Sequence, residues 1–208
     1  MPEKNIWEIL NRNLFFVKNA VSRREAKTQD KLDVYDPESR EVLLECREPD
    51  IGLLTKIARL CGGRHDTGTA FNLVARIPGS SERALRIARG NATLSFGGPV
   101  VKISDGQDSL IGKLKRKNFS LGEKFDFIPE NQGESFNLHF KGGEILCNDK
   151  KVAAFLRLNF GFFKENKFDY AFSISPEVPA NSLMRQVLLA FGFAQDRIII
   201  NSSIIILT

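Results

Sequence analysis

The segment "SLMRQVLLAFGFAQDRIII" (Ser182–Ile200) decides the fold. From Val187 to Ala194 it carries no charged or hydrogen-bonding side chain. A helix that is apolar on every side must be buried, either in a bilayer or inside its own protein. A spanning helix needs about 20 apolar residues, whereas this run stops at Gln195 and is followed by an acidic and a basic residue. We therefore expect no transmembrane span and a helix enclosed by the rest of the chain.

The rest of the chain has the pattern of short β-strands. "KLDVYD" (31–36) and "EVLLECR" (41–47) alternate apolar and polar residues around a turn, which predicts a hairpin. Further strand-like stretches are TAFNLVARI (69–77), RALRIAR (83–89), PVVKIS (99–104), SLIGKLKRK (109–117), KFDFI (124–128), ESFNLHFK (134–141), EILCN (144–148), KVAAFLRLNF (151–160) and KFDYAFSIS (167–175). About a dozen such strands predict a mainly β fold, a closed antiparallel β-barrel. Side chains alone do not fill so wide a barrel, so we expect the C-terminal helix to occupy its interior.

The length of 208 residues suits one large domain. We expect residues 14–208 to form a single barrel and residues 1–13 to be an N-terminal extension that contains a short helix. The stretch "DIGLLTKIARLCGG" (50–63) has apolar residues at helical spacing, which predicts a second short helix covering one end of the barrel.

The cysteines Cys46, Cys61 and Cys147 are odd in number and form no CxxC pair. They are typical of buried, reduced thiols, and with only His65 and His139 beside them we expect no metal site and no cofactor. The first residues lack the charged-then-apolar layout of a signal peptide, so we expect a cytoplasmic protein.

Three stretches together resemble the scramblase-related and LURP-one-related proteins: "LDVYDPESREVLLECREPDIGLLTKIARL" (32–60), "LIGKLKRKNFSLGEKFDFI" (110–128) and "KFDYAFSISPEVPANSLMRQVLLAFGFAQD" (167–196). The resemblance implies a tubby C-terminal-like domain, in which a closed barrel is threaded by a hydrophobic C-terminal helix. It also implies a phospholipid function, either calcium-dependent movement of lipid between leaflets or binding of phosphoinositide headgroups.

The chain departs from the animal scramblases in lacking a Pro-rich N-terminal region and a cluster of cysteines. The segment just before the final helix, KFDYAFSISPEVPA (167–180), offers only Asp169 and Glu177 as acids. Calcium is coordinated by six to eight oxygen ligands, several of them carboxylates, so calcium-triggered scrambling is not expected.

The stretch "LIGKLKRK" is the main candidate site. If its apolar residues face inward, Lys113, Lys115 and Lys117 project from the other face of one strand. Such a row suits an anionic lipid headgroup, and Arg86 joins it if the two strands are neighbours. The same pattern is also typical of a solvated strand whose lysines deter edge pairing, and the modest net charge of +5 leaves both interpretations open.

No catalytic set is evident, so we expect a protein that is not an enzyme. Around the first hairpin, Asp36, Glu45, Arg47 and Glu48 form a charged group, for which turn chemistry and surface ion pairs are favoured over acid–base catalysis. The stretch "GGRHDTG" (62–68) is interpreted as a loop.

Three functions remain open. The first is a non-enzymatic domain that binds anionic phospholipid or phosphoinositide at the inner face of a membrane as a peripheral protein. The second is a phospholipid scramblase, and the third is a structural or signalling adaptor without a ligand. We expect no nucleic-acid partner, because no recognition motif occurs and the aromatic residues are not interleaved with Lys and Arg.

Overall fold

The structure, a computed structural model, describes residues 5–19, 30–49, 70–90, 100–117, 123–131, 133–158 and 168–198. Within these ranges the fold is mainly β and contains twelve strands. The strands are β1 (Leu14–Asn19), β2 (Lys31–Tyr35), β3 (Val42–Arg47), β4 (Phe71–Arg76), β5 (Arg83–Arg89), β6 (Val100–Asp105), β7 (Leu110–Arg116), β8 (Glu123–Pro129), β9 (Phe136–Lys141), β10 (Glu144–Cys147), β11 (Lys150–Arg157) and β12 (Tyr170–Ile174). The expected helix at 50–63 and the loop at 62–68, with Cys61 and His65, lie outside the described residues.

The strands form one closed antiparallel barrel, which confirms the expected architecture. Each strand pairs with its neighbour in sequence, and β1 closes the ring by pairing with β12 on one side and β2 on the other. The closing strand was not among the stretches predicted from alternation. Its sequence, LFFVKN, begins with four consecutive apolar residues and so does not alternate, although only Phe15 and Val17 point to the buried side.

The barrel interior is filled by apolar side chains at alternate strand positions. On β8, for example, Phe125 and Phe127 are buried, while Lys124 before them is exposed and Asp126 between them is half-buried. Phenylalanines account for five of the largest fully buried side chains: Phe15, Phe127, Phe172, Phe191 and Phe193. The abundance of Phe in this sequence therefore serves a large apolar core, since a buried Phe ring leaves no polar group to satisfy.

The N-terminal segment contains the short helix α1 (Ile6–Leu10). The side chain of Asn5 accepts a hydrogen bond from the backbone N–H of Trp7 and so caps the helix. Ile9 and Leu10 are 3% and 4% exposed and belong to the same core as the barrel strands. The helix is thus packed against the barrel.

The apolar C-terminal segment forms α3 (Leu183–Phe193), followed after Ala194 by the short helix α4 (Gln195–Ile198). Ser182 caps α3 by accepting a hydrogen bond from the backbone N–H of Arg185. Every residue from Val187 to Phe193 is buried. No helix in the described part of the chain combines the length and apolar character that a bilayer-spanning helix requires.

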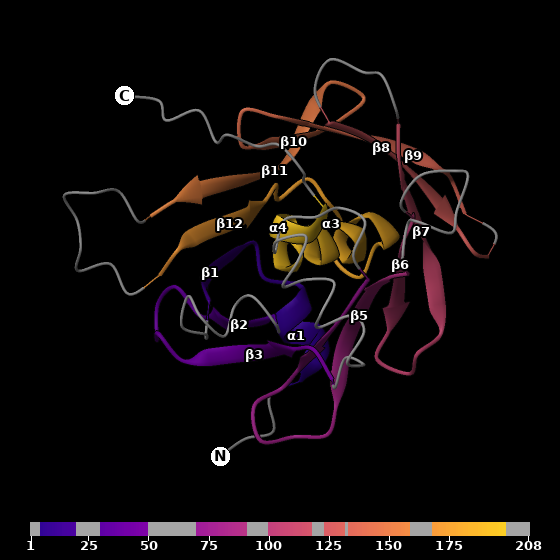
Figure 1. Ribbon diagram of the computed structural model, residues 1–208. Coiled ribbons are helices and arrows are strands. Elements are labelled where there is room, and N and C mark those ends of the chain that lie inside the picture. Colours follow the sequence, from indigo (N-terminus) through magenta and orange to yellow (C-terminus); the bar gives the residue numbers. More distant parts are fainter. Residues whose placement is uncertain are drawn as a thin grey trace, which may run out of the picture.

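The aromatic contacts of α3 reach strands on different sides of the ring. Phe191 packs edge-on against Phe125 of β8, and Phe193 packs edge-on against Phe15 of β1. The helix also contacts β5 and β12. In Figure 1, α3 lies in the middle of the view, with strands around it.

One glycine sets the distance between α3 and the sheet. A Cβ on Gly192 would lie 2.6 Å from ring carbons of Phe172 on β12, closer than real Cβ contacts. The hydroxyl of Tyr170, also on β12, donates to the carbonyl oxygen of Gly192 at 2.9 Å. The lack of a side chain at Gly192 thus permits the close approach of α3 to β12.

Candidate functional site

The lysines of β7 lie on the outer face of the barrel, as the alternation predicted. Gly112 and Leu114 are buried. Lys113, which lies between them, and Lys115, which follows Leu114, point outward. Lys117 follows the last residue of β7 and is also exposed. The structure therefore brings all three expected lysines to one side of the sheet.

Two of these lysines have acidic partners. The Nζ of Lys113 lies 2.9 Å from Glu130, and the Nζ of Lys117 lies 2.9 Å from Asp126 and 3.1 Å from the amide oxygen of Asn137. The two side chains of the Lys113 pair are 39% and 43% exposed. Exposed pairs of this kind contribute between 0 and about 1 kcal/mol to stability. A lysine can therefore leave its carboxylate partner for an anion of higher charge at little cost.

Lys115 differs from its neighbours. In the register it stands opposite Val100 of β6 and Asp126 of β8. Asp126 already pairs with Lys117. Within the part of the chain that the structure describes, no carboxylate pairs with Lys115.

The structure adds a lysine that sequence reasoning missed. Lys102 of β6 is exposed and stands directly opposite Lys113 in the antiparallel register. It too has no carboxylate partner among the described residues. Because Val101 and Ile103 face inward, alternation alone predicts that Lys102 points outward. Only the strand register shows that Lys113 is the residue opposite it. We call Lys102, Lys113 and Lys115 the lysine cluster.

Arg86 does not join the cluster directly, because β6 separates β5 from β7. Its guanidinium donates to the side-chain oxygen of Asn72 at 2.8 Å and pairs with Asp108 at 3.3 Å. Arg83 pairs with the same carboxylate. Arg86 is therefore held between Asn72 of β4 and Asp108 of the β6–β7 turn.

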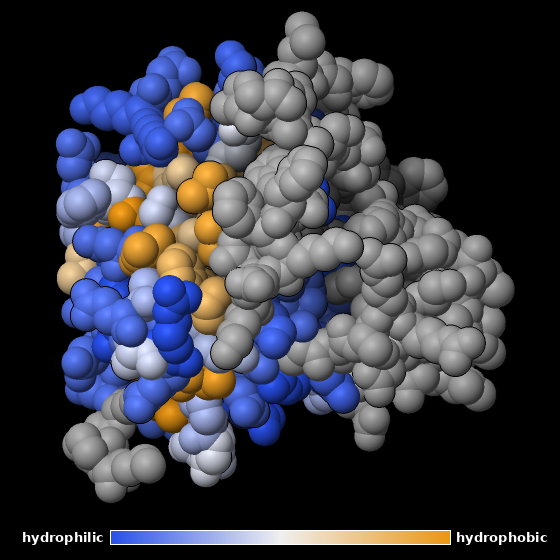
Figure 2. Space-filling model, turned by 90° about the vertical axis from the view of Figure 1, so that its left-hand side faces the viewer, coloured by the Kyte–Doolittle hydropathy of each residue, from blue (hydrophilic) through white to orange (hydrophobic). Residues whose placement is uncertain are grey.

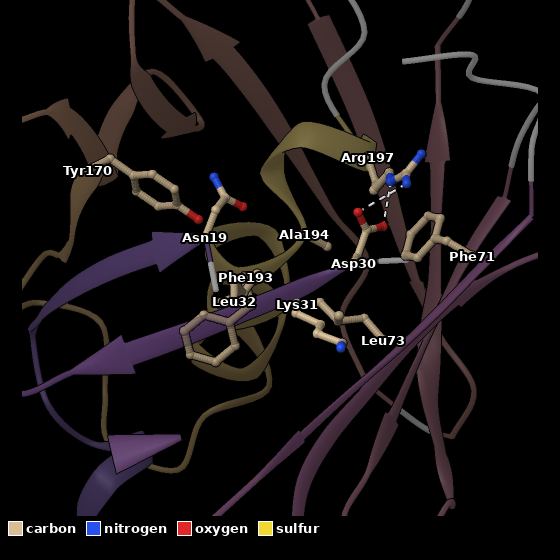
Figure 3. A pocket seen from close by; sticks show the side chains of 10 residues that line it. All are labelled: Asn19, Asp30, Lys31, Leu32, Phe71, Leu73, Tyr170, Phe193, Ala194 and Arg197. Carbon is tan, nitrogen blue, oxygen red and sulfur yellow. Dashed lines mark hydrogen bonds and ion pairs between the residues drawn. The ribbon is translucent and has the colours of Figure 1, made fainter. Parts of the chain in front are cut away.

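A pocket at one end of the barrel forms a second candidate site (Figure 3). The Nε and Nη2 of Arg197 lie 2.6 and 3.0 Å from the carboxylate of Asp30, and both side chains are buried. Arg89 donates to the carbonyl oxygen of Arg197 at 3.0 Å and lies over the ring of Phe71. Glu48 accepts hydrogen bonds from the backbone N–H groups of Asp30 and Asn72. These charges hold the end of α4 to β2, β4 and β5.

The pocket is too small for a lipid headgroup. Its cavity volume of about 20 Å³ holds roughly one water molecule, whereas ligand pockets usually have about 300 Å³ or more. The Asp30–Arg197 pair on its wall is therefore better explained as a structural contact.

The charged group of the first hairpin consists of turn and ion-pair contacts. Asp36 accepts from the backbone N–H groups of Glu38 and Ser39 and pairs with Arg12. Burial alone would raise the pKa of Asp36, but these hydrogen bonds and the Arg12 guanidinium outweigh it and hold the pKa below its usual value.

On the next strand, Arg47 pairs with Asp33 at 2.5 Å. Cys46 and Cys147 are buried free thiols, and burial raises the pKa of both. Within the described ranges, no cluster of three or more His, Cys, Asp or Glu side chains has the arrangement of a metal site.

Comparison with protein families, with curated proteins and with solved structures gave no match for this chain.

Proposed function

We propose that this protein is a non-enzymatic domain that binds anionic phospholipid or phosphoinositide headgroups at a membrane surface through the lysine cluster. The observation that carries the proposal is the pairing of Lys102 with Lys113 across two adjacent strands, with Lys115 one step along β7. Like charges directly opposite each other destabilise a sheet. A multivalent anion bound between them removes that repulsion.

The expected strength of this binding follows from the charges. A basic residue near an anionic membrane surface contributes about 1 kcal/mol, so three lysines contribute about 3 kcal/mol. That corresponds to a dissociation constant in the millimolar range for a single monomer. The proposed binding is therefore weak, reversible and sensitive to salt, as suits a peripheral protein.

We further propose that the barrel encloses α3 in the manner of the tubby C-terminal-like domains and belongs with the scramblase-related proteins. The buried faces of α3 and its contacts with β1, β5, β8 and β12 support this proposal. In such a fold the helix serves as the core, which leaves the outer strand faces to bind ligand.

A co-sedimentation experiment with vesicles tests the proposed function. The full chain is mixed with phosphatidylcholine vesicles, with or without phosphatidylserine or a phosphoinositide, over a series of salt concentrations. We expect binding to the anionic vesicles that falls as salt rises, because charge-driven attraction is screened. The variant Lys102→Ala/Lys113→Ala/Lys115→Ala is expected to lose most of this salt-sensitive binding.

The matched control removes the same charge elsewhere. Arg76, Lys141 and Lys150 are exposed cations on β4, β9 and β11. Their triple Ala variant changes net charge equally and should retain binding. Equal loss in both triple variants would mean that only net charge matters, and would overturn the assignment of the lysine cluster.

A further inference from the structure

An apolar row crosses the outer face of the barrel on the side where the ring closes. The register aligns Tyr35 of β2 with Phe16 of β1, Phe16 with Ala171 of β12, and Ala171 with Leu156 of β11. Leu156 is 63% exposed. Leu14, two residues before Phe16 on the same face of β1, is 40% exposed. We call these five residues the apolar belt.

Figure 2 shows this side of the molecule. Hydrophobic side chains gather in a band across the described part of the face, and hydrophilic ones lie above and below it. An apolar band with a polar border marks an interaction surface more often than a single exposed leucine does.

Cations border the belt. The guanidinium of Arg40 lies 4.9 Å from the ring centroid of Phe16 and 5.1 Å from that of Phe168, which itself packs on Phe16. Lys18 is the next outward residue after Phe16 on β1 and is exposed. Within the described residues, neither cation has a carboxylate partner.

Several carboxylates near the belt are already engaged with other cations. The ion pairs are Asp33 with Arg47, Asp36 with Arg12 and Glu144 with Lys151. These three carboxylates therefore do not neutralise Arg40 or Lys18.

We propose that the apolar belt is a second lipid-contacting face, which inserts Leu14 and Leu156 into the interface of an anionic bilayer. Apolar side chains bordered by cations fit the boundary between acyl chains and anionic headgroups. Arg40, whose flat face rests on two aromatic rings, keeps its N–H edges available for phosphate oxygens.

The belt and the lysine cluster lie on opposite sides of the barrel. In the closed ring of twelve strands, β1 and β7 are six places apart. Figure 1 shows the same arrangement, with β12 and β1 on the left and β6 and β7 on the right. One flat membrane cannot contact both faces. If the proposed function of the lysine cluster holds, a single barrel therefore bridges two membranes.

Vesicle clustering tests this inference. Two populations of phosphatidylcholine–phosphatidylserine vesicles carry a donor and an acceptor lipid, and energy transfer reports their approach while light scattering reports size. We expect the full chain to cluster them. The variant Leu14→Asp/Leu156→Asp is expected to lose clustering but to sediment with vesicles through the lysine cluster. Each exposed leucine that leaves the interface weakens belt binding roughly tenfold.

The controls separate this inference from the proposed function. Trp7, 48% exposed on α1, supplies the control for the single change Leu156→Asp: Trp7→Asp also exchanges one exposed apolar residue for one negative charge, and it should still cluster vesicles. If the full chain sediments with vesicles and never clusters them, the inference fails while the proposed function stands. If adding Lys102→Ala/Lys113→Ala/Lys115→Ala to Leu14→Asp/Leu156→Asp, which removes belt binding, leaves sedimentation unchanged, the proposed function fails. Sedimentation velocity without lipid completes the test. If the full chain is a dimer and Leu156→Asp is a monomer, the belt binds a second copy of the chain, and the inference is overturned.

Discussion

Arg197 and Asp30, which are 167 residues apart in sequence, form a buried two-point ion pair with N–O distances of 2.6 and 3.0 Å. The pair joins α4 to the start of β2, so the C-terminal helix is held to the barrel by charge as well as by apolar packing. A lone buried charge is costly, so the charged end of this apolar helix needs a partner. The structure identifies the partner of Arg197.

Asp30→Asn should destabilise the fold by about 3–5 kcal/mol, because it leaves the Arg197 charge buried without its carboxylate. Urea denaturation at neutral pH measures the change. The double variant Asp30→Leu/Arg197→Met removes both charges and should recover much of the loss, because apolar replacement of a whole buried pair is often neutral. A double variant less stable than Asp30→Asn would mean that the ion pair itself stabilises the fold.

Gly192→Ala should destabilise the protein by about 2 kcal/mol, although alanine is the better helix former by up to about 1 kcal/mol. The added methyl would lie 2.6 Å from the Phe172 ring. Thermal and urea unfolding measure the effect. Gly90→Ala is the matched control, because a Cβ there meets no atom within 4 Å.

The double variant Gly192→Ala/Phe172→Leu identifies the cause. If the Phe172 ring is what the methyl meets, the two substitutions are coupled, and the loss in the double variant is smaller than the sum of the single losses. Strict additivity would place the strain elsewhere.

The sequence predicts the faces of the strands well and their lateral partners poorly. Alternation correctly places Lys113 outside and Leu114 inside, because each strand has one buried face. It does not predict that Lys102 stands opposite Lys113, since register depends on turns and bulges between strands, such as the irregularity after Ile103. Lysine types and spacing thus suggest a basic strand, but only the folded sheet assembles the cluster.

Two other features escaped prediction for related reasons. β1 has adjacent apolar residues on both faces, because Phe16 joins the outer apolar row while Phe15 enters the core. The C-terminal helix divides at Ala194, where no glycine or proline marks a break. In both cases tertiary packing determines the local structure, and the order of apolar and polar residues along the chain does not predict it.

Arg185 is buried with no carboxylate partner among the described residues, and its guanidinium is satisfied by the chain around the N-terminal helix. The acceptors are the carbonyl oxygens of Leu10, Asn11, Arg12 and Val178 and the side-chain oxygen of Asn13. Burial lowers the pKa of Arg185. Arg185→Met should cost about 3 kcal/mol, because several buried acceptors lose their donor.

Limited proteolysis checks where that loss acts. We expect cleavage near residues 5–13 to speed up in Arg185→Met, because this segment is held by the guanidinium. Arg185→Lys should rescue little, since an ammonium lacks the fork of five donors. Arg83→Ala, which removes an exposed arginine paired with Asp108, should cost less than about 1 kcal/mol.

Asp36 should make the stability of the first hairpin depend on pH in the acid range. Its pKa in the folded protein lies below its usual value because, despite burial, the Glu38 and Ser39 amides and Arg12 favour the carboxylate. A group with a lowered folded pKa stabilises the fold above its unfolded pKa, and this contribution is lost as pH falls through the folded pKa. The free energy of unfolding should therefore fall below about pH 4.

Asp36→Asn isolates this contribution, because the amide cannot ionise but keeps an oxygen for the turn. The difference in unfolding free energy between the original protein and Asp36→Asn should be largest at neutral pH and shrink toward pH 3, as measured by urea titration at each pH. Glu134→Gln, which alters an exposed acid outside the strands, corrects for general charge effects. A difference that stayed constant down to pH 2 would show that the Asp36 carboxylate contributes nothing through its ionisation.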